Sequence, residues 1–238
     1  MLHQSVSKEP VLAIESLKRS YKQGGRKINV LDDVHARIYP GEAVGLVGPS
    51  GAGKSTLLHI AGLLEQPDSG SIFIYGKDCS NLDDDARTRI RRCDIGFIYQ
   101  FHQLLPEFSA LENVVLPQMI LGISKSVAEL RGMQLLSQLG LKDRLHHRPS
   151  QLSGGEQQRT AICRALANKP KLILADEPTG NLDPHTSEIV FKDLMGLFKN
   201  EGVAALIATH NLELAARMDR VLKMDNGHLA ELAPHTLL

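Results

Sequence analysis

The sequence predicts an α/β fold with a mostly parallel sheet, an antiparallel β region at its start and an inserted, mainly helical subdomain. Three observations lead to this prediction. Short apolar runs bounded by polar or turn residues recur along the chain, as in the buried strands of a parallel sheet. Helical patterns, with apolar residues spaced by three and four, lie between several of these runs. Finally, 238 residues with 42% hydrophobic and 23% charged side chains suit one domain with a packed core.

The elements can be placed in chain order. Residues 1–10 are polar and are expected to form a flexible tail. Residues 23–27 contain two adjacent glycines, which favour a hairpin turn between two early antiparallel strands. Between positions 81 and 167 the strand signal fades, and the apolar spacing over 127–139 favours helix. The residues after Gly227 predict a last strand and a short tail. Buried strands are expected at 11–14, 43–47, 172–175 and 204–208.

Composition excludes several classes of protein. Lysine plus arginine and aspartate plus glutamate both number 27, so nothing indicates a bulk electrostatic partner such as nucleic acid. The three cysteines, Cys79, Cys93 and Cys163, form no Cys-x-x-Cys pair and no cluster with histidine, so neither disulfides nor zinc are predicted. The first ten residues lack the apolar core of a signal peptide, and no apolar run approaches the roughly 18–20 residues that cross a bilayer. We therefore expect a cytosolic chain that reaches a membrane only through a partner.

The strongest local motif is a glycine-rich loop of the form G-x-x-x-x-G-K-S between the predicted strand 43–47 and a predicted helix over 56–64. It consists of Gly48, Pro49, Ser50, Gly51, Ala52, Gly53, Lys54 and Ser55. Glycines let backbone N–H groups point at a triphosphate without obstruction by Cβ, and the helix N-terminus adds partial positive charge. Lys54 is expected to reach the β- and γ-phosphates, and the Ser55 hydroxyl to bind Mg²⁺. This context disfavours the alternative of a merely flexible glycine turn.

Two carboxylates end an apolar strand. Asp176 and Glu177 follow the run 172–175, and because burying unpaired charge is costly they should face a cation or water in a cleft. Asp176 suits the Mg²⁺ shell, whereas Glu177 lies where it can orient and deprotonate the water that attacks the γ-phosphate. A solvated strand end would be an equal alternative if the glycine-rich loop were absent.

A second anion-binding helix start is predicted at Ser153, Gly154, Gly155 and Glu156, just before an expected helix over 157–167. A glycine-rich loop and an acidic strand end indicate only a nucleoside triphosphatase, a class that includes GTPases, kinases and helicases. One chain with two phosphate-binding helix ends is more specific.

With these motifs the sequence resembles the ATP-binding subunits of ABC transporters, since LSGGE at 152–156 is close to their signature LSGGQ. The resemblance covers nearly the whole chain. It implies an ABC ATP-binding domain over 11–238, with a helical subdomain over about 101–165 inserted in a RecA-like core. It also implies that the signature contacts ATP held by a second copy of the chain, so that a homodimer encloses two ATP molecules.

Four further residues match motifs of the family. Tyr21 occupies the place of the aromatic that stacks on adenine, with an ordinary half-buried strand tyrosine as the alternative. Gln100 matches the glutamine that contacts Mg²⁺ and the γ-phosphate. Asp183 matches the D-loop aspartate at the dimer interface, with a helix N-cap as the alternative. His210 matches the switch histidine at the γ-phosphate. The resemblance thus implies catalysis by Glu177, His210 and Lys54, a Mg²⁺ site of Ser55, Gln100 and Asp176, and ATP binding by Tyr21, Gln100 and residues Gly48 to Thr56.

The stretch 96–114, GFIYQFHQLLPEFSALENV, resembles more narrowly the ATPases of the bacterial lipoprotein-releasing system. That implies a peripheral subunit at the cytoplasmic face of the inner membrane. It would drive two integral membrane subunits that release acylated lipoproteins toward the outer membrane, without touching the lipoprotein itself. Residues 177–183 are shared more widely, so the ATPase of a macrolide-type exporter or of a cell-division complex is the alternative.

The same stretch is expected to dock the membrane subunit. Phe101, Leu104, Leu105 and Phe108 are apolar beside polar neighbours, as on a docking surface, although filling the core of the helical subdomain is the alternative. ABC ATPases outside transport fit less well, because no sustained heptads lie between the glycine-rich loop and the acidic strand end and only one cassette is present.

Overall fold

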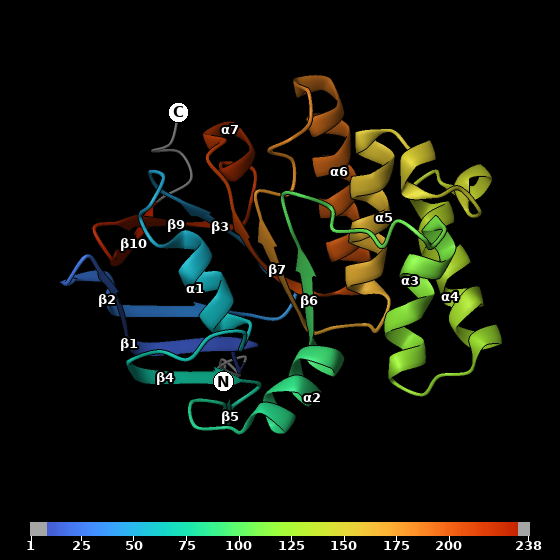
Figure 1. The fold of residues 1–238 in the computed structure, drawn as a ribbon. Coiled ribbons are helices and arrows are strands. Elements are labelled where there is room, and N and C mark those ends of the chain that lie inside the picture. The colour runs from blue at the N-terminus through green and yellow to red at the C-terminus, as the bar shows by residue number, and fades with distance from the viewer. Residues whose placement is uncertain (1–8, 233–238) are drawn as a thin grey trace, which may run out of the picture.

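The structure is a computed structural model that describes residues 9–232 (Figure 1). Most of the tail predicted over 1–10, and the short tail predicted at the end, therefore lie outside the described residues. Within residues 9–232, no helix combines the length and the apolar character needed to cross a membrane.

The larger sheet has six strands in the order β10-β9-β3-β8-β7-β6. They are β3 (Ala43–Val47), β6 (Ile95–Ile98), β7 (Leu172–Asp176), β8 (Ala204–Ala208), β9 (Arg220–Asp225) and β10 (His228–Leu232). Neighbouring strands run parallel except β9 and β10, which are antiparallel. The strands predicted at 43–47 and 204–208 are confirmed, the strand at 172–175 extends one residue further, and the predicted last strand is β10.

Both faces of this sheet are buried, which explains its continuous apolar strands. In β7, Leu172 and Leu174 join the core that contains α1 (Lys54–Ala61), whereas Ile173 and Ala175 join the core that contains α5 (Gly154–Leu166) and α6 (Pro184–Glu201). Successive residues of a strand point to opposite faces, so one apolar run serves two cores.

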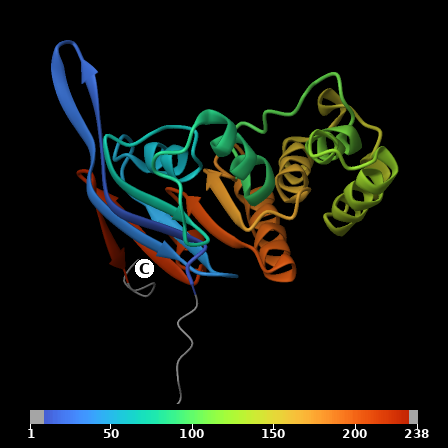
Figure 2. The same ribbon diagram turned by 90° about the horizontal axis from the view of Figure 1, so that it is seen from below.

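The smaller sheet is antiparallel, as predicted for the start of the chain. Its order is β2-β1-β4-β5, formed by β1 (Leu12–Gln23), β2 (Arg26–Ile38), β4 (Ser69–Ile74) and β5 (Lys77–Asp78). The hairpin between β1 and β2 turns at two glycines with φ of 58° and 79°, which confirms the predicted turn. This hairpin projects on the side of the molecule opposite to α3 and α4 (Figures 1 and 2). Helix α1 contacts β2 of this sheet and β7 and β8 of the larger one.

The middle of the chain is mainly helical, as predicted. The helices there are α2 (Asp84–Asp94), α3 (Ala110–Ile120), α4 (Lys125–Gln138), the 3₁₀ turns η1 (Lys142–Arg144) and η2 (Pro149–Gln151), and α5; the short α7 (Leu212–Ala215) follows α6. One strand, β6, also lies in this region and forms an edge of the larger sheet. Helices α3 and α4 pack on each other and on α5.

The predicted helix over 56–64 begins two residues earlier, at Lys54. Local capping explains two further differences. Helix α1 ends at Ala61 rather than at Leu64, because Gly62 caps it and Leu63 takes a left-handed φ of 57°. Helix α5 begins at Gly154 rather than after the signature, because the Ser153 side chain accepts the N–H of Glu156 and so caps the helix. The signature is therefore the first turn of α5.

Candidate functional site

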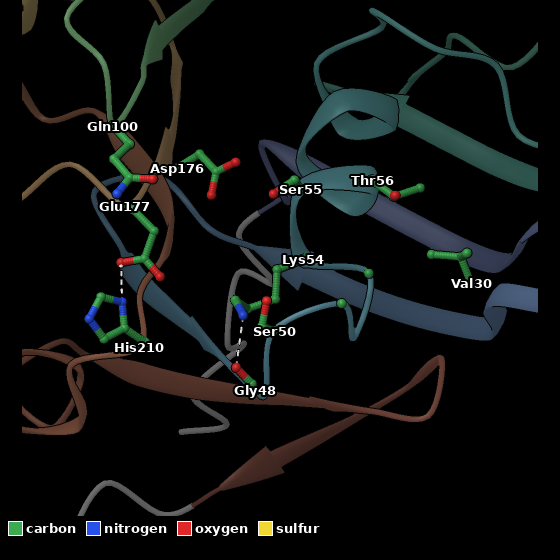
Figure 3. Close-up of a pocket in the computed structure, with 12 residues that line it drawn as sticks. Val30, Gly48, Ser50, Lys54, Ser55, Thr56, Gln100, Asp176, Glu177 and His210 are labelled. Atoms are coloured by element: carbon green, nitrogen blue, oxygen red, sulfur yellow. Dashed lines mark hydrogen bonds and ion pairs between the residues drawn. The ribbon is translucent and has the colours of Figure 1, made fainter. Parts of the chain in front are cut away.

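Many of the predicted site residues lie just after four parallel strands, at one edge of the larger sheet. The segments that follow β3, β6, β7 and β8 surround a cavity of about 540 Å³ (Figure 3). It is lined by Val30, Gly48, Ser50, Gly51, Gly53, Lys54, Ser55, Thr56, Gln100, Asp176, Glu177 and His210. Ligands of open α/β sheets bind at the carboxyl ends of the strands, which is where this cavity lies.

The glycine-rich loop joins β3 to α1 and wraps one side of the cavity. Gly53 has a left-handed φ of 103°, and a Cβ there would lie 2.8 Å from the carbonyl oxygen of Val30, so the loop requires glycine at this position. Helix α1 begins at Lys54, so its free N–H groups and positive dipole end face the cavity. The Lys54 Nζ donates to the carbonyl oxygens of Gly48 at 2.7 Å and Pro49 at 3.1 Å, which holds the ammonium over the loop.

The two carboxylates leave β7 in different directions. Asp176 is the last residue of the strand and pairs with Ala208 of β8. Glu177 takes a left-handed φ of 47°, which is uncommon for a residue other than glycine, and its N–H donates to the Ala208 carbonyl at 2.9 Å. Backbone strain of this kind persists where the surrounding structure holds it. The turn separates the two carboxylates, so they can serve different roles in the cavity.

His210 follows β8 and faces Glu177. Its Nδ1 lies 2.9 Å from Oε2 of Glu177, whose side chain is only 15% exposed, whereas the His210 side chain is 71% exposed. An exposed histidine therefore faces a largely buried carboxylate (Figure 3). A carboxylate held in this way can orient a water molecule and accept its proton.

Oxygen donors gather where Mg²⁺ is expected. The Ser55 hydroxyl, the Gln100 amide and the Asp176 carboxylate all line the cavity, and hard oxygen donors are what Mg²⁺ prefers. Within residues 9–232 there is no group of three or more His, Cys, Asp or Glu side chains able to hold a metal by themselves. An ion here would therefore share its coordination with phosphate oxygens and water, which is the usual form of a Mg²⁺–nucleotide site.

Tyr21 lies outside the residues that line the cavity. It belongs to β1, and its hydroxyl donates to both carboxylate oxygens of Glu65, at 2.7 and 2.8 Å. The guanidinium of Arg19 lies 4.8 Å from the ring centroid and covers one face. The side chain is 37% exposed, so the ring offers solvent the surface that a nucleobase would need.

Two residues of the glycine-rich loop also lie outside the main cavity. Pro49 and Ala52 line an adjoining cavity of about 300 Å³, together with Ile28 and Asn29 of β2. The loop therefore has a second, solvent-facing side beneath the β1–β2 hairpin.

The signature residues lie apart from this cavity. Ser153 caps α5, and the Glu156 carboxylate accepts the N–H of Ser153 at 2.8 Å and the Nε–H of Arg144 at 2.9 Å. The bond from the Ser153 backbone, with help from Arg144, holds the pKa of Glu156 below its usual range, although partial burial acts in the opposite direction. Ser153 and Gly154 are exposed, so the start of α5 is free to meet a ligand outside its own chain's cavity.

Asp183 caps α6, as its alternative interpretation predicted. Its carboxylate accepts the N–H groups of His185 and Thr186, each at 3.1 Å. A side-chain hydrogen bond with Thr186, followed by the bond from its backbone N–H, lowers the pKa of Asp183. The cap leaves the exposed side of Asp183 free, so it is compatible with the D-loop role.

Sequence reasoning missed two residues of the site. Val30 of β2 lines the cavity, but an apolar residue in a strand carries no signal that separates a ligand contact from ordinary packing. Asn181 forms two hydrogen bonds with Gln100, and it stood in the sequence only as a neighbour of Asp183. Both contacts join segments that are distant in the chain.

The predicted docking residues are largely exposed. Phe101 is 71% exposed, and Leu105 and Phe108 are also exposed, so the alternative of core filling is wrong for these three. The guanidinium of Arg164 donates to the backbone carbonyls of His102 at 2.9 Å and Gln103 at 2.6 Å, which ties this loop to α5. Beside it lies a largely apolar cavity of about 430 Å³, lined by residues that include Leu105 and Ile120.

Cys163 is buried, and burial raises the pKa of its thiol.

Comparison with known proteins agrees with this geometry. The family profile described as ABC transporter matches residues 31–180. The chain is 60% identical to the lipoprotein-releasing system ATP-binding protein LolD of Paramagnetospirillum magneticum, over 93% of this chain and 98% of that protein. It is also 60% identical to LolD 2 of Caulobacter vibrioides, over 93% and 97%. The dimeric structure of the ATP-binding cassette MJ0796 in a post-hydrolysis state with ADP and Pi superposes with a TM-score of 0.84, 38% identity and coverage of 93% and 99%. The chain therefore belongs to the ABC transporter family, as one of its ATP-hydrolysing subunits.

Proposed function

We propose that this chain binds and hydrolyses ATP to power the release of acylated lipoproteins from the inner membrane through membrane subunits. The observation that carries the ATPase part is the single cavity that holds the glycine-rich loop, Gln100, Asp176, Glu177 and His210. The lipoprotein part is supported by relatives named for the lipoprotein-releasing system, which are 60% identical over nearly the whole chain.

In this proposal the triphosphate lies along the glycine-rich loop. The backbone N–H groups at the start of α1 donate to phosphate oxygens, and the Lys54 ammonium exchanges its loop carbonyls for the β- and γ-phosphates. Thr56, in the first turn of α1, completes the phosphate contacts. The adenine extends toward the β1–β2 hairpin and stacks on the exposed surface of Tyr21.

Mg²⁺ would be held by Ser55, Gln100 and Asp176, and when bound it neutralises phosphate charge. Glu177 then orients a water molecule opposite the leaving ADP and takes one of its protons as the oxygen–phosphorus bond forms. The bond between the γ-phosphorus and the bridging oxygen breaks, and its electron pair leaves with ADP. His210, at 2.9 Å from Glu177, steadies the carboxylate and reaches the γ-phosphate.

A second copy of the chain completes the site. Ser153, Gly154, Gly155 and Glu156 form a helix start that lies apart from the cavity of their own chain, and its first two residues are exposed. We place this helix start against the γ-phosphate bound by the partner copy, with Asp183 at the interface between the copies. Closure would then depend on the phosphoryl group that hydrolysis removes, so cleavage loosens the dimer.

Two integral membrane subunits are the proposed partners, with the chain bound peripherally at the cytoplasmic face of the inner membrane. The exposed apolar residues Phe101, Leu105 and Phe108, and the apolar cavity beside them, support docking at this surface. The lipoprotein would be touched only by the membrane subunits. We likewise propose that residues 11–238 form one domain, with the helical subdomain inserted over about 101–165.

The test uses Glu177→Gln, which keeps the shape of the side chain and removes the base. This variant should bind ATP normally and release phosphate on the order of 10²- to 10⁴-fold more slowly than the unchanged chain. Purified with ATP from native membranes, it should bring along membrane subunits and acylated lipoprotein. A drug-export or cell-division partner instead would contradict the lipoprotein assignment, and undiminished hydrolysis would contradict the assigned base.

A further inference from the structure

We propose that Asn181 is a positioning residue that fixes the side-chain amide of Gln100, so that the amide oxygen faces the metal side of the cavity. The inference rests on the proposed function, because it concerns Mg²⁺ bound with ATP. It assigns a role to a residue that is not among those lining the cavity.

The two amides are joined by a reciprocal pair of hydrogen bonds. The Gln100 Nε2 donates to Oδ1 of Asn181 at 2.8 Å. In return, the Asn181 Nδ2 donates to the backbone carbonyl oxygen of Gln100 at 3.1 Å. Both bonds join segments that lie 81 positions apart in the sequence.

These bonds determine which way each amide points. A backbone carbonyl can only accept, so the Asn181 group that faces it must be the NH₂. The Asn181 oxygen is then on the other side and can only accept, so the Gln100 group that faces it must also be the NH₂. The Gln100 oxygen is left toward the cavity, and in Figure 3 it points to the side of the Asp176 carboxylate.

The fold holds Asn181 in place through two tight turns. The N–H of Gly180 donates to the Glu177 carbonyl at 3.0 Å, and the N–H of Leu182 donates to the Thr179 carbonyl at 3.1 Å. A Cβ at Gly180 would lie 3.0 Å from the Nε2 of Gln100, so glycine there lets the segment approach the amide closely. The placement of Asn181 therefore follows from backbone turns and not from its own exposed side chain.

Orientation matters because the two ends of an amide are similar in shape and opposite in function. The oxygen is a ligand for Mg²⁺, whereas the NH₂ group can only donate and would oppose a cation. Without Asn181 the Gln100 amide loses the partner that selects its orientation. Gln100 would then present its NH₂ group, instead of its oxygen, to the metal for part of the time. Partners that orient a metal ligand typically change metal affinity by about 10- to 100-fold.

The test measures how strongly Mg²⁺ assists ATP binding. In the full chain carrying Glu177→Gln, the Kd for ATP is determined in excess Mg²⁺ and in EDTA, and the ratio of the two is the Mg²⁺ linkage. Adding Asn181→Ala should reduce this linkage on the order of 10-fold and leave the Kd in EDTA unchanged. Asn200→Ala, which removes an exposed asparagine of α6, is the matched control and should change neither value.

Two further variants distinguish loss of the Gln100 amide orientation from a general disruption of the site. Gln100→Glu replaces the amide with a carboxylate, whose two oxygens are equivalent, so no orientation is needed. In that background Asn181→Ala should no longer reduce the linkage. Asn181→Asp keeps an oxygen that accepts from the Gln100 NH₂ and loses only the bond to the Gln100 carbonyl, so in the Gln100 chain it should preserve more of the linkage than alanine does.

The outcomes distinguish the inference from the proposed function. If the Glu177→Gln chain binds no ATP, or shows no Mg²⁺ linkage, the proposed site is wrong and the inference falls with it. If the linkage is present and Asn181→Ala leaves it intact, or reduces it equally in the Gln100→Glu background, the orienting role of Asn181 is wrong and the ATPase site stands.

Discussion

At the scale of residues, the site depends on side chains that are held before any ligand arrives. The left-handed backbone at Glu177 and its contact with His210 set the carboxylate apart from Asp176. The Lys54 ammonium is held against loop carbonyls, so its charge already lies at the loop proposed to bind the phosphates. Preorganised charge of this kind costs no rearrangement during reaction, which is the main source of catalysis in phosphoryl transfer.

Tyr21 gives a prediction at this scale. Tyr21→Ala should raise the KM for ATP on the order of 5- to 10-fold through loss of stacking. It should leave kcat little changed, because the adenine ring lies far from the phosphate bond that breaks. Glu65→Ala should raise KM by a smaller factor, because it keeps the ring but removes the contacts of Glu65 with the Tyr21 hydroxyl and with the Arg19 guanidinium that lies over the ring. Steady-state kinetics over a range of ATP concentrations would check both.

The control is Tyr21→Phe, which keeps the ring and loses only the contact with Glu65. It keeps the Arg19–Glu65 ion pair, so it should raise KM no more than Glu65→Ala does and far less than Tyr21→Ala. An unchanged KM in Tyr21→Ala would show that adenine binds elsewhere.

The sequence predicted the local motifs well and their distant contacts poorly. Lys54 and Asp176 could be placed because a loop between a strand and a helix, and a strand end, fix their positions without knowledge of the rest of the chain. The pairing of Gln100 with Asn181 could not, because it depends on turns that bring together segments far apart. The position of Val30 could not be predicted for the same reason, because β2 brings it to the cavity from a distant part of the chain.

At the scale of elements, the caps at helix ends contribute to the stability of the fold and determine where the signature lies in α5. The capping box of Ser153 and Glu156 starts α5 three residues before the apolar spacing indicated. Apolar spacing reports the buried face of a helix and not its end, which explains why the predicted ends of α1 and α5 were wrong.

Glu156 provides the prediction for this scale. Its pKa in the folded chain lies below the ordinary value of 4.5, so its contribution to stability is full above that value and is lost as pH falls through the lowered pKa. Glu156→Gln should therefore cost on the order of 1 kcal/mol at neutral pH, and the difference from the unchanged chain should shrink in acid. Urea unfolding at pH 7 and at several acidic values measures this.

Glu107→Gln, which removes an exposed carboxylate, serves as the control for loss of charge and should change stability little at either pH. A Glu156→Gln difference that stays constant from neutral to acidic pH would contradict the assigned role.

At the scale of the whole molecule, the proposed function assigns two surfaces to two different partners. It places the start of α5 against a second copy of the chain and the loop around Phe101 and Leu105 against the membrane subunits. The second surface predicts that Leu105→Glu abolishes co-purification with those subunits, because a charge would enter an apolar contact. Leu130→Glu is the matched control, since Leu130 on α4 is 66% exposed; it should co-purify normally.

If Leu105→Glu folds and still co-purifies, as judged by circular dichroism and pull-down, the docking surface lies elsewhere. If Leu130→Glu loses co-purification to the same extent, the contact with the membrane subunits is spread over the whole helical region.

The central claim is that two copies enclose ATP between the loop of one and the signature of the other. It is tested most directly by measuring the mass of the Glu177→Gln chain in solution by light scattering, with and without ATP. We predict a monomer without ATP and a dimer with it, and we predict that adding Ser153→Glu prevents the dimer while the chain still binds ATP. A chain that binds ATP and remains monomeric, or one that dimerises equally well with Ser153→Glu, would contradict the account.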